Sequence, residues 1–284
     1  MKQLITTLSF ALICVTAFAQ GEDNTKTGIV LENRDKITIE ARRSSMNFDE
    51  IEASRALRLV VEERTTGNII VRAPQSIMPY VSLKVSDGTL HATLLPGVPV
   101  SRNSNVVAEI YLPYNGRIKE ISTSSAARVI VKPTISCEDL DLEASGASVI
   151  EIKASVKECS IDASGASTIK ADITATEFDM ELSGASTATL SGEIANSDIE
   201  VSGASNLRAE NLHSATLDLE CSGASKANAA AKVCSAEASG ASLITVECQQ
   251  LLNASAMGAS TIRYSGDCRV NIINNRGASS ISKK

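Results

Sequence analysis

In the second half of the chain, apolar or small residues alternate with polar residues over short stretches that return at regular intervals. Before each interruption the apolar positions are Leu140, Leu142, Ala144; Cys159, Ile161, Ala163; Phe178, Met180, Leu182; Leu217, Leu219, Cys221; and Cys234, Ala236, Ala238. After it they are Ile150, Ile152; Ile169, Ala171; Leu207, Ala209; Ile244, Val246; and Ile262, Tyr264. A period of two is typical of strands with one buried face, and no helical i, i+3, i+4, i+7 pattern competes with it. Each repeat is therefore predicted to hold two short strands.

The interruption is a tetrapeptide, Ser-Gly-Ala-Ser, which begins at Ser145, Ser164, Ser183, Ser202, Ser222 and Ser239. Degenerate copies follow at 257–260 and 276–279, and a copy without glycine lies at 125–127. Successive glycines are 19, 19, 19, 20, 17, 18 and 19 residues apart. A near-constant period is the signature of stacked repeats. The sequence thus predicts an all-β fold, a parallel β-helix or solenoid of roughly 19-residue rungs with Ser-Gly-Ala-Ser bends. A second turn would close each rung, as at 153–158 or 192–197.

Each residue of the bend has a predicted role. A tight corner between strands requires a positive φ or the absence of a Cβ, which explains the glycine. The alanine that follows is expected to suit a narrow interior. The serine after it, present in every copy from Ser148 to Ser279, is expected to stack on its neighbours and to hydrogen-bond along the axis or to the bend.

Residues 36–120 contain strand patterns without the repeat. The candidate strands are Ile37–Ala41, Ala56–Glu62, Asn68–Ala73, Val81–Val85, Leu90–Leu95 and Val106–Leu112. Asp87-Gly88 indicates a tight hairpin between two of them. We expect this N-terminal β part to be continuous with the repeats at 121–284 and to cover their first edge, because an open end would expose unpaired strands.

The first residues have the composition of an export signal. Lys2 precedes an apolar run from Leu4 to Ala17, which is shorter than a comfortable membrane span. Ala17-Phe18-Ala19 places small residues before a polar stretch. The sequence therefore predicts a signal peptide at 1–19, a flexible linker at 20–35, and no transmembrane segment after cleavage. The expected location is outside the cytoplasm, in the periplasm, on the outer-membrane surface or in the medium.

Charge and composition exclude several classes of partner. The chain has 27 basic and 33 acidic residues, a net charge of −6, and loss of Lys2 with the leader makes it more negative. Nucleic acid is therefore not expected as a partner. The chain has only two His, too few for a typical zinc site. Cysteine spacing matches no metal motif, and a Cys248–Cys268 disulfide and buried free thiols both remain open.

One column of polar positions carries charge in almost every repeat. The residue three positions before the bend glycine is acidic in six repeats, which supply Glu143, Asp162, Glu181, Glu200, Glu220 and Glu237. Five residues before it stand Asp141, Ser160, Asp179, Asp198, Asp218 and Ser235. In a parallel stack the first set would form a row of carboxylates at intervals of about 4.8 Å. We call this first set the acidic ladder.

Three interpretations of the acidic ladder remain open. It can be a solvated face that keeps the sheet from associating laterally. It can bind the basic residues of a partner surface. It can also bind divalent cations, because Ca²⁺ prefers several carboxylate oxygens and would relieve the repulsion between them. No other cofactor is expected.

Landmarks in the first half of the chain carry a family resemblance. Residues 48–54 lead into a strand at 57–61, Val85-Ser86-Asp87-Gly88-Thr89-Leu90 follows, and Ile110-Tyr111-Leu112-Pro113 enters 118–127 before the repeats. Over about residues 45–284 the chain resembles the "putative auto-transporter adhesin, head GIN domain" family of secreted proteins from Bacteroidetes-type bacteria. The resemblance implies a β-helical fold and an exported location. It brings no catalytic motif, so no residue inherits a role.

These observations favour an exported, non-enzymatic structural or interaction protein of the bacterial envelope or surface, with adhesion to a protein or glycan as one form of that role. The carboxylates recur uniformly and include no singular acid/base pair, so an enzyme is not expected. The alternatives are a polysaccharide-binding or polysaccharide-cleaving β-helix protein and a divalent-cation-dependent binding module. Because little sequence follows the last Gly-Ala-Ser, association through the solenoid ends is also expected.

Overall fold

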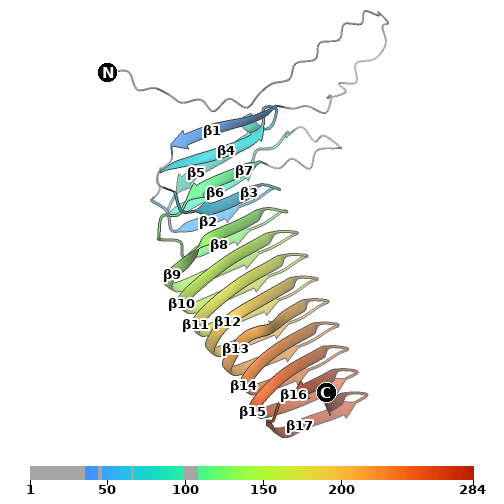
Figure 1. Ribbon diagram of the computed structural model, residues 1–284. Helices are drawn as coiled ribbons and strands as arrows, with labels where there is room; N and C mark the ends of the chain where they lie inside the picture. Colours follow the sequence, from blue (N-terminus) through green and yellow to red (C-terminus); the bar gives the residue numbers. More distant parts are fainter. Residues whose placement is uncertain (1–35, 44–46, 65–66, 99–107) are drawn as a thin grey trace, which may run out of the picture. The chain divides into compact units, whose positions relative to one another are not determined.

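The structure, a computed structural model, describes residues 36–43, 47–64, 67–98 and 108–284. All of them belong to Asn33–Lys284, one of the two units into which the chain divides. They form one sheet system of 18 strands and a single-turn 3-10 helix, η1 (Met78–Tyr80) (Figure 1). No helix among these residues is long and apolar enough to span a membrane. The predicted signal peptide and linker lie outside the described residues.

The repeats form a stack of parallel strands, as the sequence predicts. The strands are β9 (Arg128–Ala144), β10 (Val149–Ala163), β11 (Thr168–Leu182), β12 (Thr187–Val201), β13 (Asn206–Cys221), β14 (Lys226–Ala238), β15 (Leu243–Gly258), β16 (Thr261–Ser265), β17 (Arg269–Gly277) and β18 (Ser280–Lys283). From β9 to β15 each pairs in parallel with the next, and equivalent positions of successive repeats lie side by side, as Ile161 does with Met180. The chain is therefore a parallel β-solenoid.

The second turn of each rung differs from the sequence-based expectation of two separate strands. A single strand of 15 residues, β10, runs through the expected turn at 153–158. Its pairing with β11 lapses only between Ser155 and Glu158. The backbone can curve here without a break, because β10 hydrogen-bonds to both neighbouring rungs before the curve and again after it. From β9 to β15 only the Gly-Ala-Ser bends interrupt the strands, whereas the last rung has a second break between Ser265 and Arg269.

The N-terminal part adds rungs in an order that differs from the order of the chain. Its strands are β1 (Ile37–Arg43), β2 (Glu50–Ala53), β3 (Arg58–Glu62), β4 (Asn68–Pro74), β5 (Val81–Ser86), β6 (Thr89–Leu94), β7 (Glu109–Pro113) and β8 (Glu120–Thr123). On one face β2 lies between β8 and β6, and on the other β3 lies between β9 and β7. The antiparallel pairs β5–β6, β4–β7 and β1–β4 complete this end. The predicted Asp87-Gly88 hairpin is confirmed by the β5–β6 pairing.

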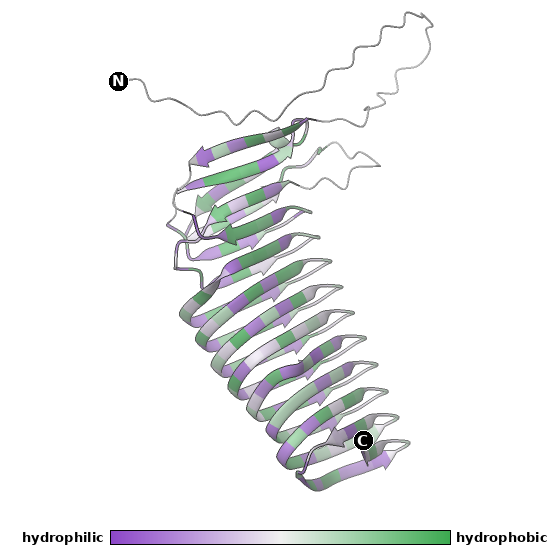
Figure 2. Cartoon of the chain, in the orientation of Figure 1, coloured by the Kyte–Doolittle hydropathy of each residue, from purple (hydrophilic) through white to green (hydrophobic). Residues whose placement is uncertain are grey.

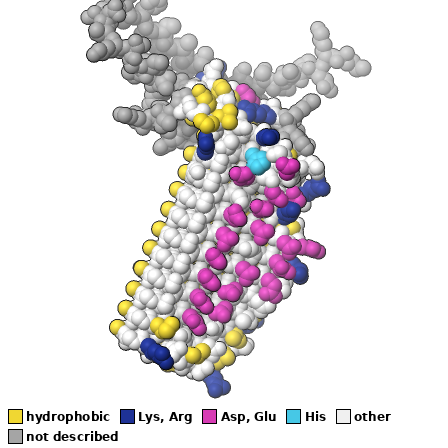
Figure 3. All heavy atoms as spheres, turned by 180° about the vertical axis from the view of Figure 1, so that it is seen from behind, with side chains coloured by type: hydrophobic (Ala, Val, Ile, Leu, Met, Phe, Trp, Pro, Cys, Tyr) yellow, Lys and Arg dark blue, Asp and Glu magenta, His cyan; other side chains and the backbone are white. Residues whose placement is uncertain are grey.

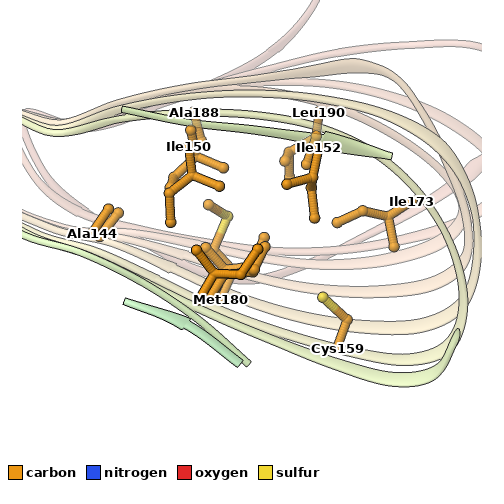
Figure 4. Packing of buried hydrophobic residues seen from close by; sticks show 14 of the residues in the cluster. Ala144, Ile150, Ile152, Cys159, Ile173, Met180, Ala188 and Leu190 are labelled. Carbon is orange, nitrogen blue, oxygen red and sulfur yellow. The ribbon is translucent and has the colours of Figure 1, made fainter. Parts of the chain in front are cut away.

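The core is a narrow layer of aliphatic side chains between the two faces of the solenoid. Every predicted inward position in β9–β14 is buried, and Phe178, with 1% exposure, is among the largest side chains there. Figure 4 shows Ile150, Ile152, Ala188 and Leu190 on one face opposite Met180 on the other. Along each strand hydrophobic and hydrophilic residues alternate (Figure 2). Alternation therefore decides which side of each strand faces inward.

At the bends, the prediction that the alanine lies in the narrow interior is wrong. The serine two residues after the glycine is the buried one, as at Ser148, Ser186 and Ser260. The alanine, for example Ala185, is exposed, and Figure 3 shows a row of apolar side chains along one edge of the stack. Even-numbered positions counted from the glycine face inward on both sides of the bend, so the parity of the flanking strands already indicated this arrangement.

Several of the buried serines hydrogen-bond to the preceding rung, and Ser186 and Ser260 also to their own bend. Ser186 Oγ donates to the carbonyls of Ser183 (2.9 Å) and Ala163 (3.3 Å) and lies 3.3 Å from Ser205 Oγ. Ser148 Oγ lies 3.0 Å from Thr123 Oγ1. These contacts run along the axis, as the sequence predicts, and they hold successive bends at a fixed spacing.

Candidate functional site

The acidic ladder forms an unbroken column on one face of the solenoid. Asp162 lies between Glu143 and Glu181 in the strand register, Glu200 pairs with Glu181 and Glu220, and Glu220 pairs with Glu237. All six side chains are exposed. Figure 3 shows the carboxylates of this face in rows that follow the stack. The strict repeat places them there, because equal spacing of the residues along the chain becomes vertical alignment in the stack.

The face carries more acid than the ladder alone. The column two residues further from the bend contains Glu50, Glu120, Asp141, Asp179, Asp198 and Asp218. A third column contains Asp139, Glu158 and Glu177, and Glu52 extends the ladder itself by way of Ser122. Sequence reasoning missed the third column, although its position seven residues before Gly146, Gly165 and Gly184 was readable. It could not place Glu50, Glu52 and Glu120, because their rungs lack the tetrapeptide.

At its N-terminal end, which we call the upper end, the acidic ladder borders a hollow in the acidic face. The hollow measures about 510 Å³ and is lined by five carboxylates and by His91, Thr89 and four serines. The carboxylates are those of Glu50, Glu52, Glu120, Glu143 and Asp162. A second hollow of about 270 Å³ lies nearer the C-terminus and is lined by Glu200, Glu220 and Glu237 and by Ser202, Ser222 and Ser239. In this second hollow a column of serine hydroxyls runs beside the column of carboxylates.

At the upper end of the ladder, neighbouring side chains hydrogen-bond to the carboxylates. Thr89 Oγ1 donates to Glu50 Oε2 at 2.6 Å, and Ser122 Oγ donates to Glu143 Oε2 at 3.0 Å. His91 Nδ1 lies 2.6 Å from Glu52 Oε2. Further down, no lysine, arginine or histidine of the described chain forms an ion pair with Glu181, Glu200, Glu220 or Glu237. The middle and lower ladder therefore presents its charge to solvent.

The local electrostatics disfavour full ionisation of some of these groups. Partial burial raises the pKa of Glu220, and the carboxylates of Glu237 and Glu200 raise it further. The pKa of Asp162 is raised by the same causes, burial first and then Glu181 and Glu143. Like charges on neighbouring rungs each disfavour the ionised form of the other. A cation placed between the rungs would relieve this repulsion between carboxylates.

The described residues contain no group of three or more His, Cys, Asp or Glu side chains arranged to hold a metal ion. The ladder carboxylates lie in a line along one face of the strands and do not surround a common point. For Ca²⁺, which takes six to eight oxygen ligands, such a row would supply part of a coordination shell and water the rest. Calcium at the ladder remains a hypothesis.

The six cysteines of the described chain are free thiols. Cys159, Cys221, Cys234 and Cys248 are buried in the core, and burial raises the pKa of the Cys159 and Cys221 thiols to about 12. Such thiols behave as small apolar residues. Cys248 and Cys268, the pair that the sequence left open, are both free thiols, and the pKa of Cys248 is raised by burial first and then by Cys268. His213 lies exposed on β13.

Residues 47–233 match the protein family described as "Putative auto-transporter adhesin, head GIN domain". The chain belongs to this family. The match spans the N-terminal rungs and the solenoid into β14, so it includes most of the acidic ladder. It confirms the resemblance inferred from the landmarks at 48–54, 85–90 and 110–113. No curated protein matches the chain.

Several solved structures share the fold of this family member. A "putative adhesin" from Parabacteroides merdae aligns with a TM-score of 0.69 at 16% identity, over 88% of this chain and 97% of that one. A "putative lipid binding protein" from Parabacteroides distasonis aligns with a TM-score of 0.65 at 18% identity, over 88% and 98%. A "putative adhesin" from Bacteroides fragilis gives 0.53 at 16% identity, over 88% and 97%. At these identities the likeness establishes the β-solenoid fold.

Proposed function

We propose that this protein is an exported, non-enzymatic adhesive module of the bacterial surface, and that its acidic face is the surface that binds. The observation that carries the proposal is the column of in-register, exposed carboxylates from Glu143 to Glu237. In its middle and lower parts the described chain provides no counter-charge. The family description as an adhesin supports the same class of function.

The geometry of the acidic face favours an extended partner that carries positive charge. Carboxylates repeat at about 4.8 Å along the stack, and the serines Ser202, Ser222 and Ser239 run beside Glu200, Glu220 and Glu237. A basic segment lying along this line can offer one ammonium or guanidinium group to each pair of rungs. Complementary charge speeds encounter and selects among partners. A rigid stack needs no rearrangement on binding, so little ordering entropy is lost on this side.

Adhesion without catalysis is also what the site chemistry favours. A hydrolase or lyase acting on a glycan needs two carboxyl groups in different environments, one protonated and one ionised. In the ladder, by contrast, each carboxylate from Asp162 to Glu220 has another ladder carboxylate on the rung before it and on the rung after it. Export is supported by the apolar leader-like segment Leu4–Ala17 and by the adhesin description of the family.

The test is binding of the full chain to oligolysine, measured by isothermal titration at low and at physiological salt. The variant Glu181→Gln/Glu200→Gln/Glu220→Gln should bind at least about tenfold more weakly, a loss of about 1.4 kcal/mol in binding free energy. The control Glu63→Gln/Glu151→Gln/Glu210→Gln removes the same charge away from the acidic face and should bind like the wild type. Equal weakening in both variants would show a net-charge effect and overturn the proposal.

Two alternatives have their own tests. If Ca²⁺ occupies the ladder, EDTA lowers the melting temperature and added Ca²⁺ raises it, and the triple Gln variant abolishes both shifts. An unchanged melting temperature rejects calcium. If the protein cleaves acidic polysaccharides, a hydrolase and lyase screen shows turnover, whereas binding without turnover agrees with the adhesive role.

A further inference from the structure

The regularity of the solenoid fails at one of the curves opposite the Gly-Ala-Ser edge. β14 has 13 residues, whereas β9–β13 and β15 have 15 to 17. In the register of β13 with β14, Ala209 pairs with Ala229 but His213 pairs with Ala230, so residues 210–212 have no partner in β14. On the other side Ala231 pairs with Cys248 and Val233 with Leu251, so Lys232 faces two residues. Irregularities of this kind re-aim side chains and are common beside functional sites.

A hollow of about 500 Å³ lies at this place. Its floor consists of four buried residues stacked in register, Ala175, Ile194, Ser214 and Ala231. Its rim consists of exposed polar side chains, which are Thr174, Glu193, His213, Lys232 and Gln249. A largely apolar floor bordered by a few polar groups is the usual composition of a small-molecule site.

The hollow arises because alanines and long polar side chains are staggered along its two walls. One wall runs Thr174, Glu193, His213 and then Ala230, which are paired rung by rung. The other wall contains Ala195, Ala215, Lys232 and Gln249. Long side chains at the upper end of the first wall therefore face alanines on the second, and Lys232 and Gln249 at the lower end face Ala230. The space that the alanines leave open is bordered by polar groups from both sides.

The chemistry of the rim differs from that of the acidic face. Lys232 and Gln249 supply hydrogen-bond donors, Glu193 supplies acceptors, and His213 supplies one of each when neutral. Such a mixture suits a ring that carries several hydroxyl groups, each of which donates and accepts. Lys232 adds a cation that can form a charge-assisted bond to a carboxylate. A cationic ligand would bind the acidic ladder, whereas an anionic ligand can pair with Lys232 in this hollow.

We propose that the hollow at the short rung β14 is a saccharide-binding site that takes one uronate unit of an acidic glycan. The small alanines of the two walls let the ring approach the backbone, Lys232 pairs with the carboxylate, and Glu193, His213 and Gln249 bind hydroxyl groups. This site is separate from the acidic face and does not depend on the cationic partner proposed for it. It would give the module a second, chemically opposite ligand.

The experiment is saturation-transfer NMR of the full chain with D-glucuronate and with D-glucose as the neutral comparison. Glucuronate should bind saturably and more tightly than glucose. Lys232→Met should weaken the binding of glucuronate by about tenfold, because one charge-assisted hydrogen bond is lost. It should leave the binding of glucose unchanged. Ala230→Leu, which fills the open space, should abolish both. Lys226→Met, at the other end of β14, removes the same charge and serves as the control.

Unchanged melting temperatures would show that these variants fold. The proposal is overturned if glucuronate shows no saturable transfer, or if Lys226→Met weakens it as much as Lys232→Met does. It is also overturned if Ala230→Leu folds and still binds. The ladder variant should lose oligolysine binding and still bind glucuronate. Failure of one proposal can therefore be told apart from failure of the other.

Discussion

A Cβ atom built on Gly184 would lie 2.6 Å from the carbonyl oxygen of Gly165. The same carbonyl accepts a hydrogen bond from the Ala185 amide at 2.7 Å, and Gly184 itself has a φ of +73°. Equivalent contacts recur at every rung from Gly165 to Gly277. The glycine is thus required twice, for its left-handed backbone and for the close approach of successive bends.

Replacing this glycine should be costly. Gly184→Ala combines the left-handed penalty of an L-residue with a contact that the backbone must relieve. We expect the free energy of unfolding to fall by about 2 kcal/mol or more, measured by urea denaturation. Gly67→Ala is the control, because a Cβ there meets nothing within 4 Å and the substitution should be neutral or slightly stabilising. Equal midpoints for the two variants would contradict the role of the bend.

The buried serines should differ in their contribution to stability according to their hydrogen bonds. Ser260 Oγ donates to the carbonyls of Met257 at 2.8 Å and Ala238 at 2.9 Å, whereas Ser167 Oγ is buried without a partner among the described residues. Ser260→Ala should therefore lower the free energy of unfolding by about 1 kcal/mol, and Ser167→Ala should leave it unchanged or raise it. The same chemical denaturation measures both, and a larger loss at Ser167 would refute this account.

The acidic ladder should make stability fall as pH rises. The folded state raises the pKa of Glu220 and Asp162, mainly through partial burial and then through neighbouring carboxylates. The folded chain then binds more protons than the unfolded chain between the ordinary carboxyl pKa and the raised one, so stability declines as pH rises through that window. Glu220→Gln should melt above the wild type at pH 7, and the difference should shrink on acidification toward about pH 4.

Glu62 provides a control of opposite sign. Its pKa is lowered, chiefly by the hydrogen bond from Lys132 at 2.7 Å and then by Arg64. A lowered pKa stabilises the folded state above the ordinary carboxyl pKa, and this contribution is lost as pH falls. Glu62→Gln should therefore melt below the wild type at pH 7 and approach it in acid. Parallel pH profiles for the two variants would show that ladder repulsion is not the cause.

The C-terminal rung should associate with a second copy. β17 and β18 pair with β15 and β16 on one side only among the described strands, and Ile272 and Ile273 are 53% and 57% exposed. Unpaired strand edges with apolar side chains promote pairing between chains. We expect a concentration-dependent rise in scattering mass for the full chain, which Ile272→Lys/Ile273→Lys abolishes. Leu95→Lys, an exposed apolar site outside these strands, should have no effect, and a chain that stays monomeric at all concentrations would refute the prediction.

Much of this architecture follows from the alternation of residues and from a nearly constant repeat. Once Gly146, Gly165 and Gly184 recur at equal spacing, parallel stacking has one natural register, and that register aligns Glu143, Asp162 and Glu181. The inward set could be read for the same reason, because side chains alternate strictly along a strand. The buried Ser148 could have been read too, since it shares the parity of its flanking strands.

What only the tertiary structure decided lies where that periodicity is absent or broken. The order of the first rungs, with β6 and β7 outside β2 and β3, depends on long-range pairing that no local pattern specifies. The hollow at β14 depends on how a 13-residue strand aligns against longer neighbours and on which wall each alanine occupies. Local alternation determines which way a side chain points, but only the pairing of distant strands determines which side chains meet.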